Sequence, residues 1–351
     1  MDIYFEREIV DIKKIDSSKK YWFVRTYGGS LYEEYFEKEY IGLGFNKVPL
    51  EYIKKGDIKD KSTLTDLTTY IQNNTRYRGA DATKWAKQLI IFDKEVKIGD
   101  IVIIPSENSN KFSIGTITSD TYLVKDPGTF QNKAEIEHFP EKRKKVKWEK
   151  TMLKSEFQGE LRNLTTTHQG ITNADKYFMV IEGQLSNLYV KEEKTYLIIQ
   201  INQDEDINAF VLNRFLASLT YFYNEFCIEN NVEPNEELSI KIKLQSKGRV
   251  ALIAASIVGV VGISTLLLLS DNTELKADLK QMKVEGKSDG LLNSISNFLD
   301  RNQERRMRYE VFQDSLNRLK VQHKVDSVKL NHEITDNVKK KGKKQKGKNN
   351  R

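Results

Sequence analysis

VALIAASIVGVVGISTLLLL, the stretch from Val250 to Leu269, contains no charged residue, no proline and no amide side chain. An α-helix rises ~1.5 Å per residue, so this stretch would form a helix of ~30 Å, which matches the hydrocarbon thickness of a bilayer. We therefore expect a single transmembrane helix over residues 249–270, surrounded by the lipid bilayer. A buried helix of a globular core, which is also apolar on all sides, is the alternative.

Small residues recur every four positions within this stretch, at Ala251, Ala255 and Gly259. In one helix they would share a face, and small side chains let two helix backbones approach closely in a membrane. The pattern favours a homo-oligomer that associates through this face. Small residues that merely face lipid are the simpler interpretation of the same spacing.

The excess of 57 Lys and Arg over 50 Asp and Glu is concentrated at the C-terminus. Residues 339–351 hold eight basic side chains and no acid, so the rest of the chain is close to neutral. A near-neutral surface argues against tight binding of duplex DNA, because phosphate neutralisation normally dominates that affinity. We expect the Lys-rich tail, residues 336–351, to be disordered and to attract an anionic partner such as phospholipid, nucleic acid or acidic protein.

The N-terminus, MDIYFEREIVDIKK, has acids among its first residues and lacks the apolar core and cleavage site of a signal peptide. We therefore expect the N-terminal domain to stay cytoplasmic, anchored by a late single-pass membrane helix. The lone Cys227 excludes an internal disulfide, and the four histidines show no metal-ligand spacing. Neither a metal site nor a cofactor is expected.

The first 150 residues mix short apolar strands with amphipathic helices. Aromatic and β-branched runs predict strands, and helical periodicity predicts helices between them. Together they predict an α+β fold in which a small β-barrel has helices packed against it. The predicted strands are 21–26, 40–46, 101–104, 112–118 and 143–148, with a hairpin turn at 106–110, and the predicted helices include 62–73 and 82–95.

Five segments follow one another in this region: YWFVRTYGGSLYEEYFEKEYIGLGFN, ATKWAKQLIIF, IGDIVIIP, FSIGTIT and KRKKVKW. Over residues 20–150 the succession resembles the N-terminal PUA/EVE-like domain of Mrr-type restriction endonucleases and related phage-defence proteins. The resemblance implies a barrel that receives a nucleobase, often a modified one, in an aromatic-lined pocket. Where that family usually has Gly-Trp, this chain has Gly44-Phe45, which keeps a ring but loses the indole N–H donor.

The residue types in this reader domain, residues 1–150, define a candidate binding site. A base that is read alone is taken out of its stack and held between aromatic faces. Arg25 ends an apolar strand, where a guanidinium needs an anionic or carbonyl partner. The glycines would let backbone approach a ligand, although Gly28 and Gly29 also suit a plain turn, and Trp85 also suits a helical core. The candidate base- or nucleotide-binding residues are Arg25, Tyr27, Gly28, Gly29, Gly44, Phe45, Asn46, Trp85 and Trp148.

The second half of the chain divides where its composition changes. Residues 151–187 are interpreted as a linker, and residues 188–246 as a small α/β adaptor domain of βαβ type. Beyond the expected membrane helix, residues 271–335 carry a sparse apolar repeat that predicts an amphipathic helix or coiled coil.

A nuclease follows the linker in Mrr-type chains, and the resemblance implies a strand with an acid, then Glu or Gln with Lys two positions on. The matching strand YLIIQIN offers Gln200-Ile201-Asn202 and lacks the lysine. No catalytic residue is therefore expected.

These observations favour a membrane-anchored sensor. Its N-terminal domain would bind a modified or single-stranded nucleic acid or a nucleotide, and would signal to the membrane helix in bacterial anti-phage defence. A non-catalytic membrane tether, whose barrel and α/β domain bind protein partners, is the alternative from another class. A divergent Mrr-like nuclease is the third hypothesis, and Mg²⁺-dependent cleavage abolished by Gln200→Ala would support it. The defence setting rests on the resemblance alone.

Overall fold

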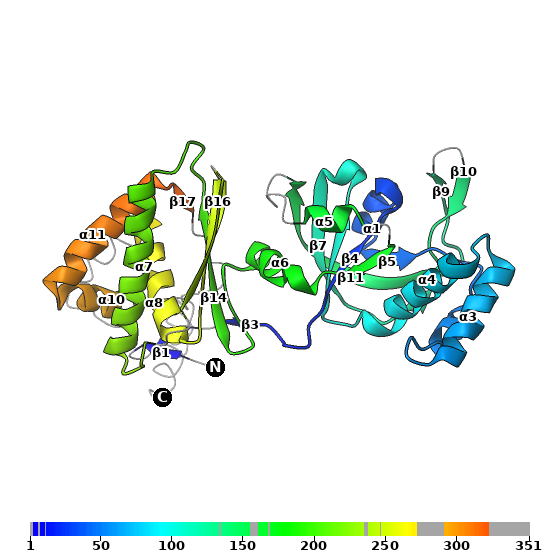
Figure 1. Cartoon of the computed structure of the whole chain (residues 1–351), viewed down its shortest axis with the longest axis horizontal. Helices are drawn as coiled ribbons and strands as arrows, with labels where there is room; N and C mark the ends of the chain where they lie inside the picture. Colours follow the sequence, from blue (N-terminus) through cyan, green and yellow to red (C-terminus); the bar gives the residue numbers. More distant parts are fainter. Residues whose placement is uncertain are drawn as a thin grey trace, which may run out of the picture. The chain divides into compact units, whose positions relative to one another are not determined.

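The computed structural model describes residues 3–5, 8–10, 12–132, 135–154, 161–167, 169–234, 238–245, 247–271 and 291–322. The chain divides into two units, each with its own sheet and core (Figure 1). Residues 18–185 form the half-barrel unit. Residues 1–17 and 186–351 form the sheet–helix unit. The predicted mixture of α and β structure is therefore confirmed.

A seven-stranded sheet curls through the half-barrel unit (Figure 1). The long strand β11 (Lys142–Leu153) pairs with β5 (Tyr40–Leu43) at its start and with β7 (Lys111–Ile117) along the rest. A bulge between Trp148 and Lys150 adds local twist. One strand thus joins two parts of the sheet and bends it into half a barrel. The order is β12-β4-β6-β7-β11-β5, with β4 at Tyr21–Val24, β6 at Ile101–Pro105 and β12 at Ile171–Asn173, while β8 (Tyr122–Leu123) pairs with β11.

Both faces of this sheet are covered, which explains why its inner strands are continuous apolar runs. In β4, Trp22 and Val24 enter one core and Tyr21 and Phe23 enter another. Side chains of α3 and α4 line the first core, and those of α5 and α6 line the second. The unit contains α1 (Tyr32–Glu37), α2 (Leu50–Lys55), α3 (Lys61–Asn74), α4 (Gly79–Ile90), α5 (Arg162–Thr165), α6 (Phe178–Leu185) and the hairpin of β9 (Thr129–Asn132) with β10 (Glu135–His138).

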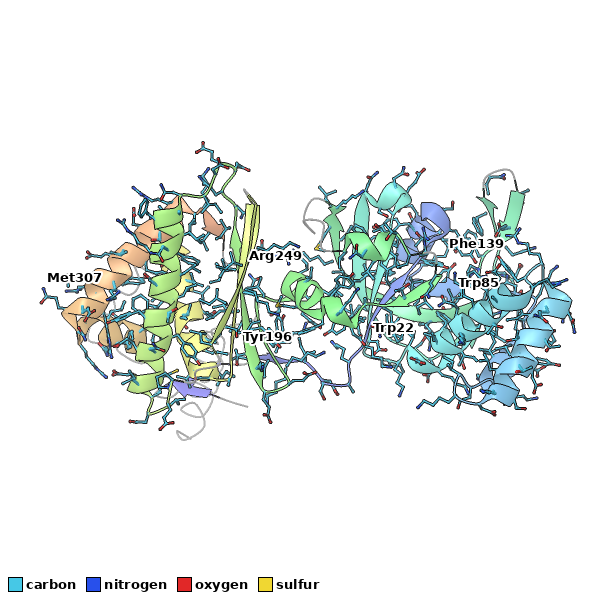
Figure 2. The ribbon with its side chains drawn as sticks, viewed as in Figure 1. Trp22, Trp85, Phe139, Tyr196, Arg249 and Met307 are labelled. Atoms are coloured by element: carbon cyan, nitrogen blue, oxygen red, sulfur yellow. The ribbon has the colours of Figure 1, made fainter. Side chains whose placement is uncertain are left out.

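Asp100 of the GDIV segment is a structural residue at the start of β6. Its carboxylate accepts the indole N–H of Trp22 at 2.9 Å, and the backbone N–H groups of Lys20 (3.1 Å) and Lys97 (2.9 Å). Trp22 is among the labelled side chains of Figure 2. These three bonds fix the entry of β6 next to β4 and satisfy a carboxylate that is only 5% exposed.

A six-stranded sheet with helices on one side makes up the sheet–helix unit (Figure 1). Its core packs alternate residues of the central strand, Leu197, Ile199 and Ile201, against the helices. The order is β15-β16-β14-β13-β3, and β17 also pairs with β14. The strands are β3 (Lys13–Lys14), β13 (Leu188–Lys191), β14 (Lys194–Ile201), β15 (Ser239–Gln245), β16 (Lys247–Ala254) and β17 (Val321–Gln322), and the helices are α7 (Ala209–Glu229), α8 (Ile257–Asp271), α10 (Leu291–Asp300) and α11 (Gln303–Arg318). A separate hairpin joins β1 (Ile3–Phe5) and β2 (Glu8–Val10).

The N-terminus completes this second sheet. β3 lies parallel to β13, with Lys14 opposite Val190, and the Ile15 N–H donates to the carbonyl of Val190 at 2.8 Å. Since β13 begins only at Leu188, the sheet–helix unit is built from two distant parts of the chain, and the whole half-barrel unit lies between them in sequence.

The apolar stretch from Val250 to Leu269 is not one helix. Its first five residues end β16, Ala255 and Ser256 form a connection, and the remainder lies in α8. Because β16 is an inner strand and α8 is buried in the core, both elements need apolar side chains without any lipid. The expected continuous membrane helix over residues 249–270 is therefore wrong. Within the described ranges we find no helix with the length and apolarity that a membrane crossing requires.

The proposed packing face of Ala251, Ala255 and Gly259 is also wrong. Ala251 lies in β16, Ala255 in the connection and only Gly259 in α8. A Cβ atom at Gly259 would stand 2.5 Å from Cδ2 of Tyr223, so this glycine serves the close contact of α8 with α7 within the chain.

Several predicted boundaries also differ from the structure. Residues 151–187 are not simply a linker, because β12 and α6 belong to the half-barrel unit. The adaptor boundary at residue 246 separates β15 from its ladder partner β16, and residues 1–17 belong with the sheet–helix unit. Within the range 271–335, for which an amphipathic helix or coiled coil was expected, the described residues form α10 and α11, and both pack into the core with α7. The tail 336–351 lies outside the described residues.

Candidate aromatic binding site

Six half-buried aromatic rings gather in the half-barrel unit. The ring centroids of Phe45 and Trp85 are 4.6 Å apart, and those of Phe45 and Tyr77 are 5.1 Å apart. Nearby, the ring of Phe130 is 6.2 Å from that of Tyr27. Figure 2 labels two of the rings, Trp85 and Phe139. The printed distances define two groups of rings, Phe45 with Tyr77 and Trp85, and Tyr27 with Phe130 and Phe139, which meet through the loop of Gly44 and Asn46. We call the two groups together the aromatic cluster.

The loop after β5 holds Phe45 in an unusual backbone conformation, with φ at 69°. This left-handed region is unfavourable for a bulky residue, so the surroundings must fix it. Asn46 supplies two of the bonds: its Nδ2 donates to the Phe139 carbonyl at 2.9 Å, and its Oδ1 accepts the Glu141 N–H at 3.1 Å. Asn46 therefore positions the loop, and its amide is engaged with backbone.

Lys142 also holds this loop in place. It is 1% exposed, and its Nζ donates to the carbonyls of Phe45 (2.9 Å) and Val48 (3.0 Å). Burial lowers the pKa of Lys142 to about 8, and the nearby Glu141 offsets part of that effect. Burial disfavours the charged form of an amine, which lowers the pKa, although Lys142 stays mostly protonated at neutral pH.

The stability of the half-barrel unit should consequently depend on pH. Between the folded pKa of about 8 and the ordinary value of 10.5, the unfolded chain binds more protons at Lys142 than the folded chain does. The free energy of unfolding should rise across this window, by up to roughly 3 kcal/mol relative to a Lys142→Met variant. Urea titrations at a series of pH values would measure the difference. The same substitution at the exposed Lys145 should leave the profile parallel to the wild type, and a parallel profile for Lys142→Met would contradict the prediction.

Tyr27 fills the space that Gly44 leaves. A Cβ atom at Gly44 would stand 2.2 Å from the Tyr27 Oη, so this glycine makes room for the phenol and not for a ligand. Burial raises the pKa of Tyr27 to about 12, and the charge of Glu137 adds to the rise. The hydroxyl therefore stays protonated at neutral pH and can donate a hydrogen bond.

Gly170 lies between Arg25 and the cluster and connects them. Its backbone N–H donates to the Gly170 carbonyl at 2.9 Å, and a Cβ at Gly170 would be 3.2 Å from Cζ3 of Trp85. Its Nη1 donates to the carbonyl of Thr167. The prediction that this guanidinium needs a carbonyl or anionic partner is confirmed by that contact.

Six predicted site residues are not members of the cluster. Arg25, Gly44 and Asn46 adjoin it as described above, and the other three have different roles. Gly28 (φ 73°) and Gly29 (φ 110°) form the turn of the short 3-10 helix η1 (Tyr27–Gly29). Trp148 donates its indole N–H to the Tyr35 carbonyl at 3.1 Å and stacks on Phe36. In the part of the chain that the structure describes, no ring contact joins Trp148 to the aromatic cluster.

Tyr77, Phe130 and Phe139 are cluster members that the sequence interpretation missed. Tyr77 lies in the triplet Arg76-Tyr77-Arg78, an aromatic residue between two basic ones, which was a usable signal. The Arg76 guanidinium is 5.5 Å from the Tyr77 ring centre, and the Lys38 ammonium is 5.8 Å from that of Phe139. A side-chain cation therefore lies over each of these two rings.

Half-buried rings beside positive charge can stack with a flat ligand. Among the described residues, we find no group of three or more His, Cys, Asp or Glu side chains placed to hold a metal ion.

Comparison with known proteins gives one finding. A family model described as Domain of unknown function (DUF8426) matches residues 22–172, from β4 to β12, and this range contains the whole aromatic cluster. No curated protein and no solved structure matches the chain significantly.

Proposed function

We propose that the half-barrel unit is a reader of a modified or unpaired base, or of a nucleotide, and that the aromatic cluster is its binding surface. The observation that carries the proposal is the half-burial of six neighbouring rings. Rings needed only for the core are normally covered, as Trp22 and Tyr35 are in this unit. Rings that pack on one side and meet solvent on the other can stack with a base.

The charges around the cluster support a nucleotide ligand. Arg76 stands over Tyr77, and Lys38, which also pairs with Glu34 at 2.8 Å, stands over Phe139. Both would lie beside a bound phosphate or base. Because Lys and Arg before the Lys-rich tail are balanced by Asp and Glu, a pocket for one base suits this unit better than a duplex groove.

The resemblance of residues 20–150 to base-reading domains of phage-defence proteins supports the same proposal and is the only link to a defence setting. The proposal does not include signalling through a membrane helix, since residues 250–269 form a strand and a core helix.

Single-ring substitutions test the proposal. In the full chain, Tyr77→Ala and Trp85→Ala are each expected to weaken binding of a short labelled single-stranded oligonucleotide about tenfold, because stacking contributes ~1–3 kcal/mol per base. Fluorescence anisotropy at fixed salt would measure this, using oligonucleotides with unmodified or methylated cytosine and free nucleotides as competitors.

Phe36→Ala is the matched control, because Phe36 is also half-buried but stacks on Trp148, outside the cluster. It should leave binding unchanged. Equal losses for Phe36→Ala and Trp85→Ala, or no binding of any probe by the wild type, would contradict the proposal.

A further inference from the structure

The two groups of rings in the aromatic cluster are distinct from each other. We call Phe45, Tyr77 and Trp85 the first ring group, and Tyr27, Phe130 and Phe139 the second ring group. Ring centroids in contact are 4.6–5.7 Å apart in the first ring group and 5.0–6.2 Å apart in the second. Among the described residues, every ring contact of the cluster joins two members of the same group.

The loop of Gly44, Phe45 and Asn46 is where the two ring groups meet. Phe45 itself belongs to the first ring group. Gly44 makes room for the hydroxyl of Tyr27, and Asn46 donates to the carbonyl of Phe139 at 2.9 Å, so both neighbours of Phe45 contact the second ring group. The two groups are therefore adjacent, with one short loop between them.

The turn between α3 and α4 holds the first ring group. The N–H of Tyr77 donates to Oγ1 of Thr75 at 3.2 Å, and the carbonyl of Tyr77 accepts Nη1 of Arg78 at 2.8 Å. These bonds fix the backbone of Tyr77 while its half-buried ring packs on Phe45 and Trp85. A base that stacks here meets rings that are already in position, so little ordering is required on binding.

The base of the β9–β10 hairpin holds the second ring group. Phe139 directly follows β10, and its N–H donates to the carbonyl of Gly128, just before β9, at 3.1 Å. The rings of Phe130 and Phe139 stack, with 5.0 Å between centroids and 25° between planes. Both rings are half-buried. A second set of ring faces is therefore fixed by a different part of the chain.

Each ring group has a cation of its own. The Arg76 guanidinium is 5.5 Å from the ring centre of Tyr77 in the first ring group, and the Lys38 ammonium is 5.8 Å from that of Phe139 in the second. Lys47, which is exposed, follows Asn46 in the loop between the groups. A bound nucleotide uses a ring face for its base and positive charge for its phosphate, and the cluster provides this combination twice.

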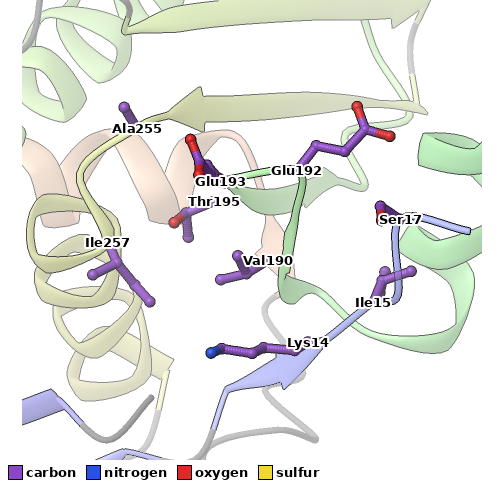
Figure 3. A pocket seen from close by; sticks show the side chains of 9 residues that line it. All are labelled: Lys14, Ile15, Ser17, Val190, Glu192, Glu193, Thr195, Ala255 and Ile257. Carbon is purple, nitrogen blue, oxygen red and sulfur yellow. The ribbon is translucent and has the colours of Figure 1, made fainter.

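The cavity of the sheet–helix unit differs in kind from the cluster. It has a volume of about 440 Å³ and lies where β3, the β13–β14 hairpin and the start of α8 meet (Figure 3). Aliphatic, hydroxyl and charged side chains line it, and the lining residues that the structure describes include no aromatic ring. A position where a second base can stack is therefore better provided by the cluster itself.

We propose that the aromatic cluster binds two adjacent nucleotides of a single strand, with one base on each ring group. One ring group holds the base that is read, and the other stacks the base beside it. The phosphate that links the two nucleotides passes the loop between the groups, next to Lys47. This inference rests on the proposed reader function and makes it more specific, because the ligand is then a single-stranded nucleic acid and not a free nucleotide.

Isothermal titration calorimetry with the full chain at fixed salt tests the inference with three probes. They are dCMP, a dinucleotide of two deoxycytidines, and a dinucleotide of the same charge whose second nucleotide lacks its base. The complete dinucleotide should bind about tenfold more tightly than either of the others, because its second base stacks on a ring group of its own. This comparison uses the wild-type protein, so it does not depend on the folding of a variant.

Two variants locate the second base. Tyr77→Ala in the first ring group and Phe139→Ala in the second should each reduce the tenfold preference for the complete dinucleotide to less than about twofold, because one ring group remains. Phe36→Ala is the control, since Phe36 is half-buried but stacks on Trp148 outside the cluster. It should keep the preference of the wild type.

The outcomes separate this inference from the reader function. If dCMP, or the dinucleotide that lacks its second base, binds as tightly as the complete dinucleotide, the inference is overturned and the reader function stands. Loss of the preference in only one of the two cluster variants would also overturn the inference, because the other ring group would then hold no base. If no probe binds saturably to the wild type, both the inference and the reader function are overturned.

Discussion

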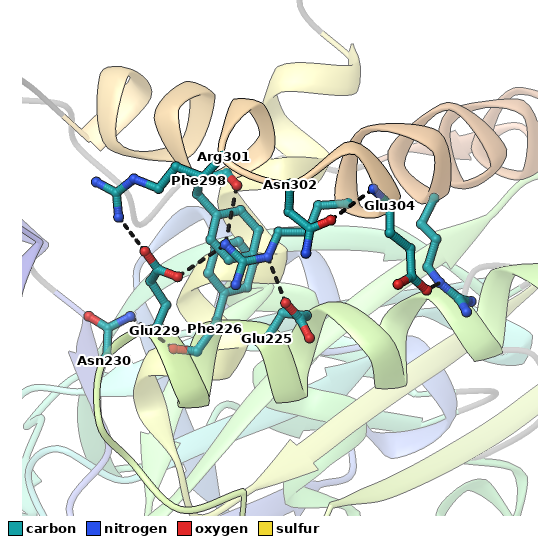
Figure 4. Close-up of polar contacts among 10 residues, drawn as sticks. Glu225, Phe226, Glu229, Asn230, Phe298, Arg301, Asn302 and Glu304 are labelled. Carbon is teal, nitrogen blue, oxygen red and sulfur yellow. Dashed lines mark hydrogen bonds and ion pairs between the residues drawn. The ribbon is translucent and has the colours of Figure 1, made fainter.

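Replacing Arg305 with alanine is expected to lower the free energy of unfolding of the sheet–helix unit by about 3 kcal/mol. The Arg305 side chain is 9% exposed and pairs with Glu225 at 2.6 Å and Glu229 at 3.0 Å, which join α11 to α7 (Figure 4). Its guanidinium also lies 4.1 Å from the ring centre of Phe298, which stacks on Phe226. The substitution removes the cation and leaves two partly covered carboxylates close together, so helix docking is weakened.

Urea unfolding followed by circular dichroism would measure this loss. Arg306→Ala is the matched control on the same helix: Arg306 is 65% exposed and pairs with Asp300 at 2.9 Å. A surface pair of this kind contributes only ~0–1 kcal/mol, so the control should change stability little. Similar losses in both variants would show that Arg305 does not clamp the helices as described.

Gly29→Ala is expected to destabilise the half-barrel unit by at least about 3 kcal/mol. Two independent effects add. The φ of 110° is strained for any residue with a side chain, and the new Cβ would stand 2.3 Å from the Cα and 2.4 Å from the N of Glu107. Those are backbone atoms of the 3-10 helix η3 (Glu107–Ser109), which connects β6 and β7, so the clash cannot be relieved by a side-chain rotation.

Gly28→Ala separates the two effects. Gly28 also has a positive φ, 73°, but a Cβ there meets nothing within 4 Å, so only the backbone strain of ~1 kcal/mol remains. Thermal or urea unfolding of the two variants beside the wild type would give the difference. If both substitutions lower the free energy of unfolding equally, the contact with Glu107 adds nothing to the backbone strain.

Local signals were enough to predict much of the half-barrel unit. The hairpin of residues 101–118 forms as β6 and β7 with Pro105 opposite Phe112, because a buried apolar run is followed by a short polar turn and a second run. The helix expected at 82–95 begins at Gly79 and ends as the π-helical turn η2 (Ile91–Glu95). These elements depend on neighbours in sequence, which a pattern can reveal.

The stretch 250–269 shows where such patterns fail. Hydropathy measures only how apolar a run is, and an inner strand followed by a buried helix gives the same value as one membrane helix. The one available signal was Ser256, a residue that favours helix starts, placed where β16 ends. The sequence alone does not show that β14, α7 and α10 cover both elements.

The candidate site could be predicted only in part, because some of its contacts join residues that are far apart in the sequence. Phe45 and Trp85 carry obvious rings, and they do meet. Phe139, however, is joined to the loop of Phe45 by a contact distant in sequence, because Asn46 donates to its carbonyl across 93 positions. Long-range contacts of this kind have no local signature, so Trp148 could be included and Phe139 omitted by equally reasonable pattern arguments.

The parallel pairing of β3 with β13 limits the order in which the two units can fold during synthesis. Residues 18–185 can fold once they have emerged, because all their strand partners lie within that range. Within the six-stranded sheet β3 comes first in sequence, but its partner β13 begins only at Leu188, and β17, the last strand to pair with β14, begins at Val321. The half-barrel unit can thus fold as an insert before β3 of the sheet–helix unit has its partner. A variant that slows folding of the insert would extend the time during which that strand is open to aggregation.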